Sequence, residues 1–185
     1  SPPNIDTVSK QSNILYKLAH KKIDLLIVSA TNLLWRLPPK EYINNGSLEL
    51  NINQDFDIDT LRNQLTSSGY KRVSMVKNPG DFSIRGSLVD LFSPSLDDPL
   101  RVDFSDDIIE SLRIFDSENQ LTLRKVDQAM IIPANHYPNN SEAFDIFKEN
   151  MRNSFEGNQM DWPLYNFIET DAASYGVHNY IPFFF

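Results

Sequence analysis

The chain has 185 residues, a formal net charge of −8 and no cysteine. The acidic balance argues against a protein whose main task is to grip phosphate backbone, and the missing cysteine excludes a disulfide framework and a thiolate metal site. An apolar share of 41% is enough for a core, so wholesale disorder is excluded as well.

No apolar run approaches the roughly 20 residues of a membrane span, and no charged and apolar leader opens the sequence. We therefore expect a cytoplasmic protein with no membrane partner. The chain starts without methionine and ends in three phenylalanines, which would be poorly placed in water. These ends predict a piece of a longer protein.

The first part of the chain, residues 1–46, has the pattern of an α/β layer. Apolar residues at helical spacing predict a helix over 4–18. The continuous apolar run Ile23–Val28 predicts a strand covered on both faces, as in a parallel sheet. Ser29 to Asn32 then offer N-capping side chains to a short helix, Leu33–Leu37, which two prolines end.

After Asn44-Asn45-Gly46 the pattern changes to that of a strand-rich module. Leu48–Ile52 alternates like an edge strand. A helix carrying Leu61 and Leu65 follows, with Asp59 as its predicted cap and Gly69 at its end. Tyr70–Val76 is predicted to be a further alternating strand.

Residues 80–116 predict an antiparallel meander, which is the centre of the module. Its three apolar runs are Phe82–Phe92, Leu100–Phe104 and Ile108–Phe115. A loop with two prolines separates the first two runs, and Ser105-Asp106-Asp107 is predicted to be a three-residue hairpin connection between the last two.

Alternation within these runs assigns faces to the side chains. Leu100, Val102 and Phe104 are predicted to face a core, and Arg101 and Asp103 the opposite side. In the third run the predicted core residues are Ile108, Leu112 and Ile114, with Arg113 opposite them.

Past Pro133 a helical pattern returns. Ser141 is predicted to cap a helix whose apolar stripe is Phe144, Phe147, Met151 and Phe155. Residues 156–180 give no clear pattern. The predicted fold is therefore α/β plus α+β: a partial RecA-like α/β layer, 1–46 and 134–185, with an inserted, mainly antiparallel β module carrying a helix at 47–133.

A search for catalytic chemistry finds no complete motif. None of the six glycines precedes the Lys-Ser or Lys-Thr pair of a P-loop, so nucleotide hydrolysis by this chain is not expected. The three histidines have no partner at metal-ligand spacing. The carboxylates Asp97, Asp98, Asp106 and Asp107 lie at predicted turns, where capping is their usual role. We expect no cofactor, no metal and no catalytic residue.

The charged face of the meander remains as the candidate site, and two interpretations of it stay open. Arg85 and Arg101 could pair with Asp90 or Asp103 across the sheet, each pair contributing only a fraction of a kcal/mol. Alternatively, the two guanidinium groups anchor a protein interface, where arginine is favoured. Gly86, inside an apolar run, indicates a bulge or a close backbone approach.

The meander also resembles a known family. Similar to the UvrA-binding domain shared by UvrB and the bacterial transcription-repair coupling factor, Mfd, are Gly80-Asp81-Phe82, Ile84 to Phe92, Leu100 to Phe104, Asp107, Ile109 to Arg113 and Phe115-Asp116. Asp24 to Pro38 resembles part of the degenerate helicase-like domain that flanks this module, and Ile131 to Pro138 resembles the coupling factor's return into it. Two segments, Ile131 to Pro138 and Ser111 to Asp116, favour the coupling factor over UvrB.

The resemblance implies a non-catalytic docking fragment that recruits UvrA to stalled RNA polymerase in nucleotide excision repair. The parent protein would be an ATP-dependent DNA translocase that reaches RNA polymerase and DNA through its other domains. Partner-binding residues carried over are Arg85, Gly86, Arg101, Asp103 and Phe104. The pattern departs at Ser105, where the family often has an aromatic residue. Alternatives are the equivalent region of UvrB, a structural spacer and a hydrolase using the aspartates.

Overall fold

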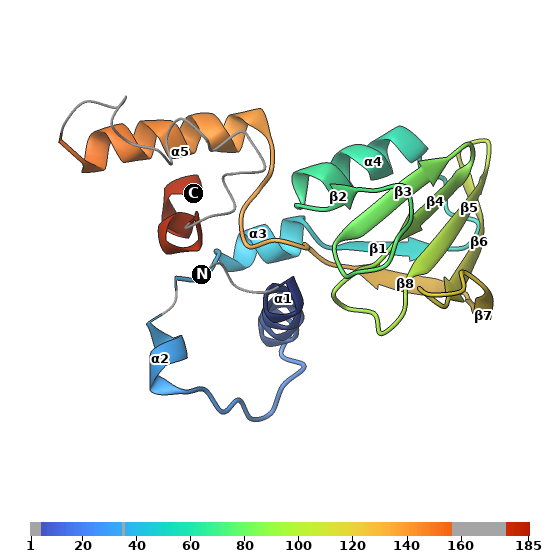
Figure 1. Ribbon diagram of the computed structural model, residues 1–185, viewed down its shortest axis with the longest axis horizontal. Helices are drawn as coiled ribbons and strands as arrows, with labels where there is room; N and C mark the ends of the chain where they lie inside the picture. The colour runs from blue at the N-terminus through green and yellow to red at the C-terminus, as the bar shows by residue number, and fades with distance from the viewer. Residues whose placement is uncertain (1–4, 35, 157–176) are drawn as a thin grey trace.

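The computed structural model describes residues 5–34, 36–156 and 177–185 (Figure 1). Six-stranded and two-stranded sheets lie on one side of the molecule, and α5 and the C-terminal helix lie on the other. Helices and strands have these bounds: α1 Ile5–Ala19, α2 Ala30–Leu33, α3 Lys40–Asn45, β1 Leu48–Asn51, α4 Ile58–Ser67, β2 Lys71–Arg72, β3 Asp81–Arg85, β4 Leu88–Leu91, β5 Leu100–Ser105, β6 Ile108–Phe115, β7 Thr122–Val126, β8 Gln128–Ile131, α5 Ser141–Ser154 and the 3₁₀ helix η3 Val177–Phe184.

The predicted meander is confirmed, and it forms most of the larger sheet. Strands follow the order β2-β3-β4-β5-β6-β7, and every pair is antiparallel except the short parallel contact of β2 with β3. In β5 the alternation is as predicted: Leu100, Val102 and Phe104 are buried, and Arg101 and Asp103 are half-buried on the other side. The strand predicted over 70–76 is shorter, because only Lys71 and Arg72 pair with β3.

Two turns of the meander differ from the sequence prediction. The apolar run Phe82–Phe92 is a hairpin, in which Gly86 and Ser87 form the turn between the paired residues Arg85 and Leu88. Gly86 has φ +60° and is therefore a turn glycine, which corrects the predicted bulge. Between β5 and β6 the pairing of Ser105 with Ile108 leaves a two-residue turn instead of the predicted three.

A β-bulge corrects the predicted face of Ile108. The register of β5 and β6 shifts between Asp103 and Phe104, so that Phe104 lies opposite Ile109. Ile109 is consequently buried, and the side chain of Ile108 is 47% exposed. Leu112 and Ile114, beyond the bulge, are buried as predicted. An extra residue reverses the alternation of a strand, and local sequence gives little sign of where that happens.

One face of the six-stranded sheet carries the main core. Helix α4 packs Leu61 and Leu65 against it, and the antiparallel pair β1–β8 adds Leu50 and Ile131. The pairing of Leu48 with Ile131 also brings the two ends of this part of the chain together. The opposite face of the sheet, here called the outer face, carries most of the charged side chains of β3 to β7.

Helix ends differ from prediction by one or two residues. The cap of α4 is Asp57, whose carboxylate accepts a hydrogen bond from the backbone N–H of Thr60 at 2.8 Å, so the predicted cap Asp59 is wrong. The cap of α5 is Asn140, where Ser141 was predicted. Gly69 has φ +84° just past the end of α4, as predicted, and an added Cβ would collide with Asn135.

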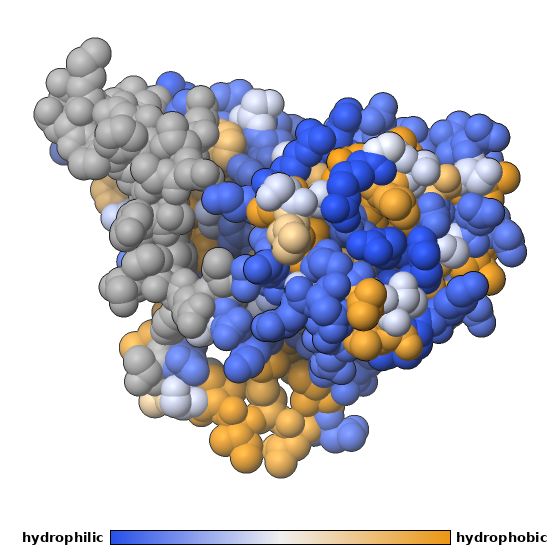
Figure 2. Space-filling view, turned by 45° about the vertical axis from the view of Figure 1, so that its right-hand side comes forward, coloured by the Kyte–Doolittle hydropathy of each residue, from blue (hydrophilic) through white to orange (hydrophobic). Residues whose placement is uncertain are grey.

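The predicted strand Ile23–Val28 is wrong. The segment forms no strand, and Leu25 and Ile27 are 78% and 88% exposed. Among the described residues no strand pairs with this segment, so it is part of no β-sheet. The segment before α2 runs below α1 in Figure 1, and Figure 2 shows hydrophobic residues at this lower edge of the molecule. Helix α2 also lies earlier than the predicted Leu33–Leu37.

Helices α1 and α5 pack on separate small cores. Tyr16 of α1 contacts Ile43 of α3 and Ile132, which follows β8. Phe147 and Met151 of α5 pack against Phe184 of η3, so that much of the predicted apolar stripe is buried. At the end of that stripe Phe155 is 44% exposed. Most of the unassigned segment 156–180 lies outside the described residues. The described flanking segments therefore contain helices and no strand, and the RecA-like sheet around them stays a prediction.

Candidate functional site on the outer face of the sheet

Strand register gathers six charged side chains on the outer face. Asp90, Arg101, Arg113 and Lys125 are successive cross-strand partners from β4 to β7. Arg85 and Asp103 lie in the neighbouring row, each paired with Leu88 of β4. Adjacent strands are about 4.8 Å apart, so these residues from five strands form one continuous patch.

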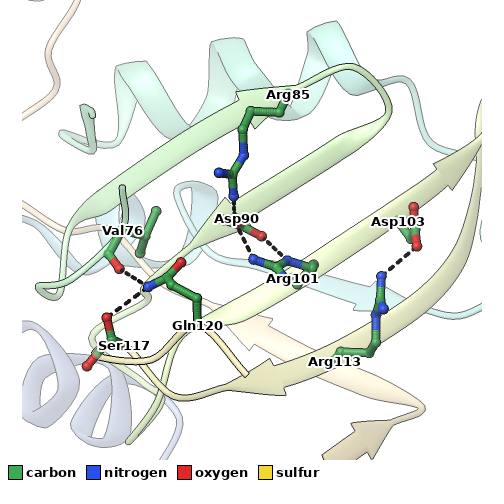
Figure 3. A network of polar contacts seen from close by, with 8 residues as sticks. All are labelled: Val76, Arg85, Asp90, Arg101, Asp103, Arg113, Ser117 and Gln120. Carbon is green, nitrogen blue, oxygen red and sulfur yellow. Dashed lines mark hydrogen bonds and ion pairs between the residues drawn. The ribbon is translucent and has the colours of Figure 1, made fainter. Parts of the chain in front are cut away.

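Asp90 is the centre of this arrangement. Its side chain is only 2% exposed, and it accepts hydrogen bonds from both predicted arginines. Arg85 donates through Nη2 to Oδ2 at 2.6 Å. Arg101 donates through Nε to Oδ1 at 2.7 Å and through Nη2 to Oδ2 at 2.9 Å, which is the bidentate geometry of a strong pair. Figure 3 shows the two guanidinium groups converging on this carboxylate.

The two arginines differ in how much of them a partner could reach. The side chain of Arg101 is 16% exposed, and its guanidinium lies 4.7 Å from the ring centre of Phe115. Its hydrogen bonds to Asp90 raise the pKa of Arg101 above its usual value, so the group stays charged. The side chain of Arg85 is 54% exposed and uses one nitrogen for Asp90. Arg85 is therefore the more accessible of the two.

A second ion pair lies beside the first. Arg113 donates through Nη2 to Asp103 at 2.7 Å, and the two side chains are 28% and 27% exposed. The Nε of Arg113 is buried and has no hydrogen-bond partner. A small apolar cluster of Val73, Val76, Phe92 and Phe115 borders the patch.

This apolar border is held by the turn after β6. Gln120 donates through Nε2 to the carbonyls of Val76, at 3.3 Å, and Ser117, at 2.8 Å (Figure 3). The contact ties the β6–β7 turn to the loop after β2, so the edge of the outer face near Phe115 has a fixed shape.

The sequence-predicted site residues are not all on one face. Arg85, Arg101 and Asp103 are together on the outer face, and Gly86 lies at the adjoining turn, where an added Cβ would meet no atom within 4 Å. Phe104 is 4% exposed in the main core, so its side chain cannot touch a partner directly. Of the two open interpretations of the arginines, internal pairing is observed.

The sequence analysis does not predict the central role of Asp90 or the contribution of Arg113 to the site. It gives Asp90 only as one possible partner of the arginines, and Arg113 only as a residue opposite the predicted core. The signal that could have found them is strand register: once Asp90 is set opposite Arg101, Arg113 follows on the next strand. Register depends on where turns lie and how long they are, and the sequence analysis predicts no turn at Gly86-Ser87 and one residue too many between β5 and β6.

Within residues 5–34, 36–156 and 177–185, no three His, Cys, Asp or Glu side chains are grouped so that they could hold a metal ion. No helix in the same ranges has the length and apolar character to cross a bilayer. The arrangement offers charge, hydrogen-bond donors and a rigid surface.

The strand-rich part of the chain is similar to a known family. Residues 48–137 match the family model of the UvrB interaction domain. The outer face, from β3 to β7, lies wholly inside these matched residues.

The similarity to known proteins extends beyond residues 48–137 to nearly the whole chain. The chain is 33% identical over 183 residues to the transcription-repair-coupling factor of Escherichia coli (strain K12), which is 99% of this chain and 16% of that protein. The coupling factor of Rickettsia bellii is 33% identical over 184 residues, again 99% and 16%. That of Staphylococcus aureus (strain USA300) is 34% identical over 149 residues, 80% and 13%. The chain thus spans about a sixth of the length of these relatives.

Proposed function

We propose that this chain is a non-catalytic docking module that binds a UvrA-type protein through the outer face. The observation that carries the proposal is the buried carboxylate of Asp90, which holds Arg85 and Arg101 on a rigid sheet inside a UvrB interaction domain. Arginine is over-represented at the energetic centres of protein interfaces. An arginine already held in place loses less side-chain freedom on binding, so less of the interaction energy is spent on ordering it.

Internal pairing of the arginines is compatible with docking. The six residues of this patch are two carboxylates, Asp90 and Asp103, and four cations, Arg85, Arg101, Arg113 and Lys125, so their charges sum to +2. The whole chain carries −8. A partner with carboxylates at its surface would therefore meet attraction at this face and repulsion elsewhere, which favours one orientation of approach.

The wider role follows from the relatives. Their name, transcription-repair-coupling factor, supports a function in nucleotide excision repair linked to transcription. In this proposal the module recruits UvrA, and contacts with RNA polymerase and DNA, together with ATP-driven translocation, belong to other domains of a longer protein. The site residues for UvrA are Arg85, Arg101 and Asp103, with Gly86 shaping the adjacent turn.

A binding titration with purified UvrA tests the proposal. Arg85→Ala should weaken binding by about 1–3 kcal/mol without unfolding the domain, because Arg85 is half-exposed and its removal leaves Asp90 bound to Arg101. Arg62→Ala is the matched control, since Arg62 also forms an exposed ion pair, with Asp59 on α4, away from the outer face. Equal affinity for UvrA in both variants would exclude the outer face as the docking site.

A structural spacer is the second candidate, and the internal ion pairs are the observation that favours it. In that case the arginines serve only to hold β3, β4 and β5 together. Arg101→Ala would then lower the melting temperature, and the unaltered chain would show no affinity for UvrA. Saturable binding of UvrA by the unaltered chain refutes the spacer.

A further inference from the structure

Three cations lie directly beside one another at the β7 side of the outer face. Arg101 is paired with Arg113, and Arg113 is paired with Lys125, in consecutive antiparallel ladders. Side chains directly opposite on an antiparallel pair have Cβ atoms about 5 Å apart, and like charges at this distance destabilise the sheet. Folding alone gives no reason for such a row.

The carboxylates of the patch compensate this row only at one end. Asp90 binds Arg101 and Arg85, and Asp103 binds one nitrogen of Arg113. The Nε of Arg113 has no acceptor. Lys125 is exposed and has no ion pair within the part of the chain that the structure describes. The uncompensated charge is therefore concentrated at β6 and β7.

We propose that Arg113 and Lys125 form a second cationic contact that takes an acidic segment of the same protein partner. This inference rests on the proposed function, and it extends the interface from β3–β5 across the sheet to β7. An acidic side chain of the partner placed above Lys125 would relieve its repulsion with Arg113, which gives the interface a charge requirement at a position distinct from the Arg85 end.

The charge distribution favours an acidic protein surface over a nucleic acid. A nucleic acid is a continuous polyanion, and a chain of net charge −8 repels it at long range. Asp103, whose side chain is 27% exposed, also lies among these cations and would repel a phosphate placed above them. A protein can place individual carboxylates at the cations and leave the aspartates uncontacted.

Charge reversal on neighbouring residues of β7 provides a matched test. Lys125→Glu alters the outer face, whereas Arg124→Glu alters the next residue, which is paired with Ile114 and is exposed on the opposite side of the strand. Both variants change the net charge by the same amount. We expect Lys125→Glu to weaken UvrA binding about tenfold at about 50 mM NaCl and less at about 300 mM, and Arg124→Glu to change it less than about twofold.

The outcomes separate this inference from the proposed function. If the unaltered chain binds UvrA, Arg85→Ala weakens the binding, and Lys125→Glu behaves like Arg124→Glu, then the second contact is wrong and the first stands. If the unaltered chain does not bind UvrA, both fail. If Lys125→Glu leaves UvrA binding intact and abolishes binding to a DNA duplex, the occupant is a nucleic acid and the inference is overturned.

Discussion

The carboxylate of Asp90 should contribute far more to stability than its place on an exterior sheet face suggests. Asp90→Asn removes the charge and one acceptor oxygen from a group that is 2% exposed and holds two guanidiniums. The Arg85 contact is worth at most about 1 kcal/mol, because that side chain is 54% exposed and water can replace the carboxylate.

The Arg101 contact sets the size of the effect. Arg101 is 16% exposed, so its charge would be left largely buried against Phe115 without a counter-ion. Removing one partner of a buried pair costs about 3–5 kcal/mol, and the remaining amide oxygen of asparagine recovers part of this. We expect a loss of about 2–4 kcal/mol, which corresponds to about 4–16 °C in melting temperature for a chain of this size.

Urea unfolding followed by circular dichroism measures this free energy of unfolding. Asp97→Asn is the control, because Asp97 is an exposed aspartate in the loop before β5. A double-mutant cycle with Arg101→Met should show coupling, since Asp90 and Arg101 contact each other directly. A loss no larger than that of Asp97→Asn, or additive effects in the cycle, would refute the central role given to Asp90.

Three further predictions concern the fold. Leu61→Ala, at a fully buried position in the main core, should lower the free energy of unfolding in urea by about 2–5 kcal/mol. Leu25→Ala, at a position 78% exposed, should lower it by less than about 0.5 kcal/mol. Similar losses in the two variants would support the predicted buried strand over 23–28. Asn140→Ala should cost about 1 kcal/mol and Ser141→Ala much less, and the reverse order would make Ser141 the cap of α5. Hydrogen bonds from Thr60 lower the pKa of the Asp57 carboxyl in the folded chain. The contribution of Asp57 to the stability of the fold is therefore complete above the pKa of an unfolded aspartate, near 4, and is lost as pH falls through the lower pKa of the folded state. The melting-temperature difference between the unaltered chain and Asp57→Asn should accordingly shrink from pH 6 to pH 2, and a constant difference would contradict this.

Much of the strand-rich module follows from local pattern. The alternation of Leu100, Val102 and Phe104 marks one face of β5 without any tertiary information, because side chains of a strand alternate with period two. Helical spacing likewise places α1, α4 and α5 close to their observed positions. The fold class and the meander could thus be predicted from sequence.

The candidate site was only half predictable. Composition and alternation put Arg85, Arg101 and Asp103 on the charged side of the meander, and the resemblance selected them as partner-binding residues. That Asp90 holds both arginines, and that Arg113 and Lys125 continue their row, depends on which residues lie opposite each other. Cross-strand neighbours are distant in sequence, and a change of one residue in a turn moves all of them.

The sequence by itself determined which segments are amphipathic and that the chain has no cysteine. Tertiary structure alone decided that the apolar run Ile23–Val28 forms no strand and that a bulge buries Ile109 in place of Ile108. The physical reason is that a strand exists only when another backbone pairs with it. Hydrophobicity and periodicity depend on residues that are neighbours in the sequence, whereas strand pairing depends on residues far apart in the chain.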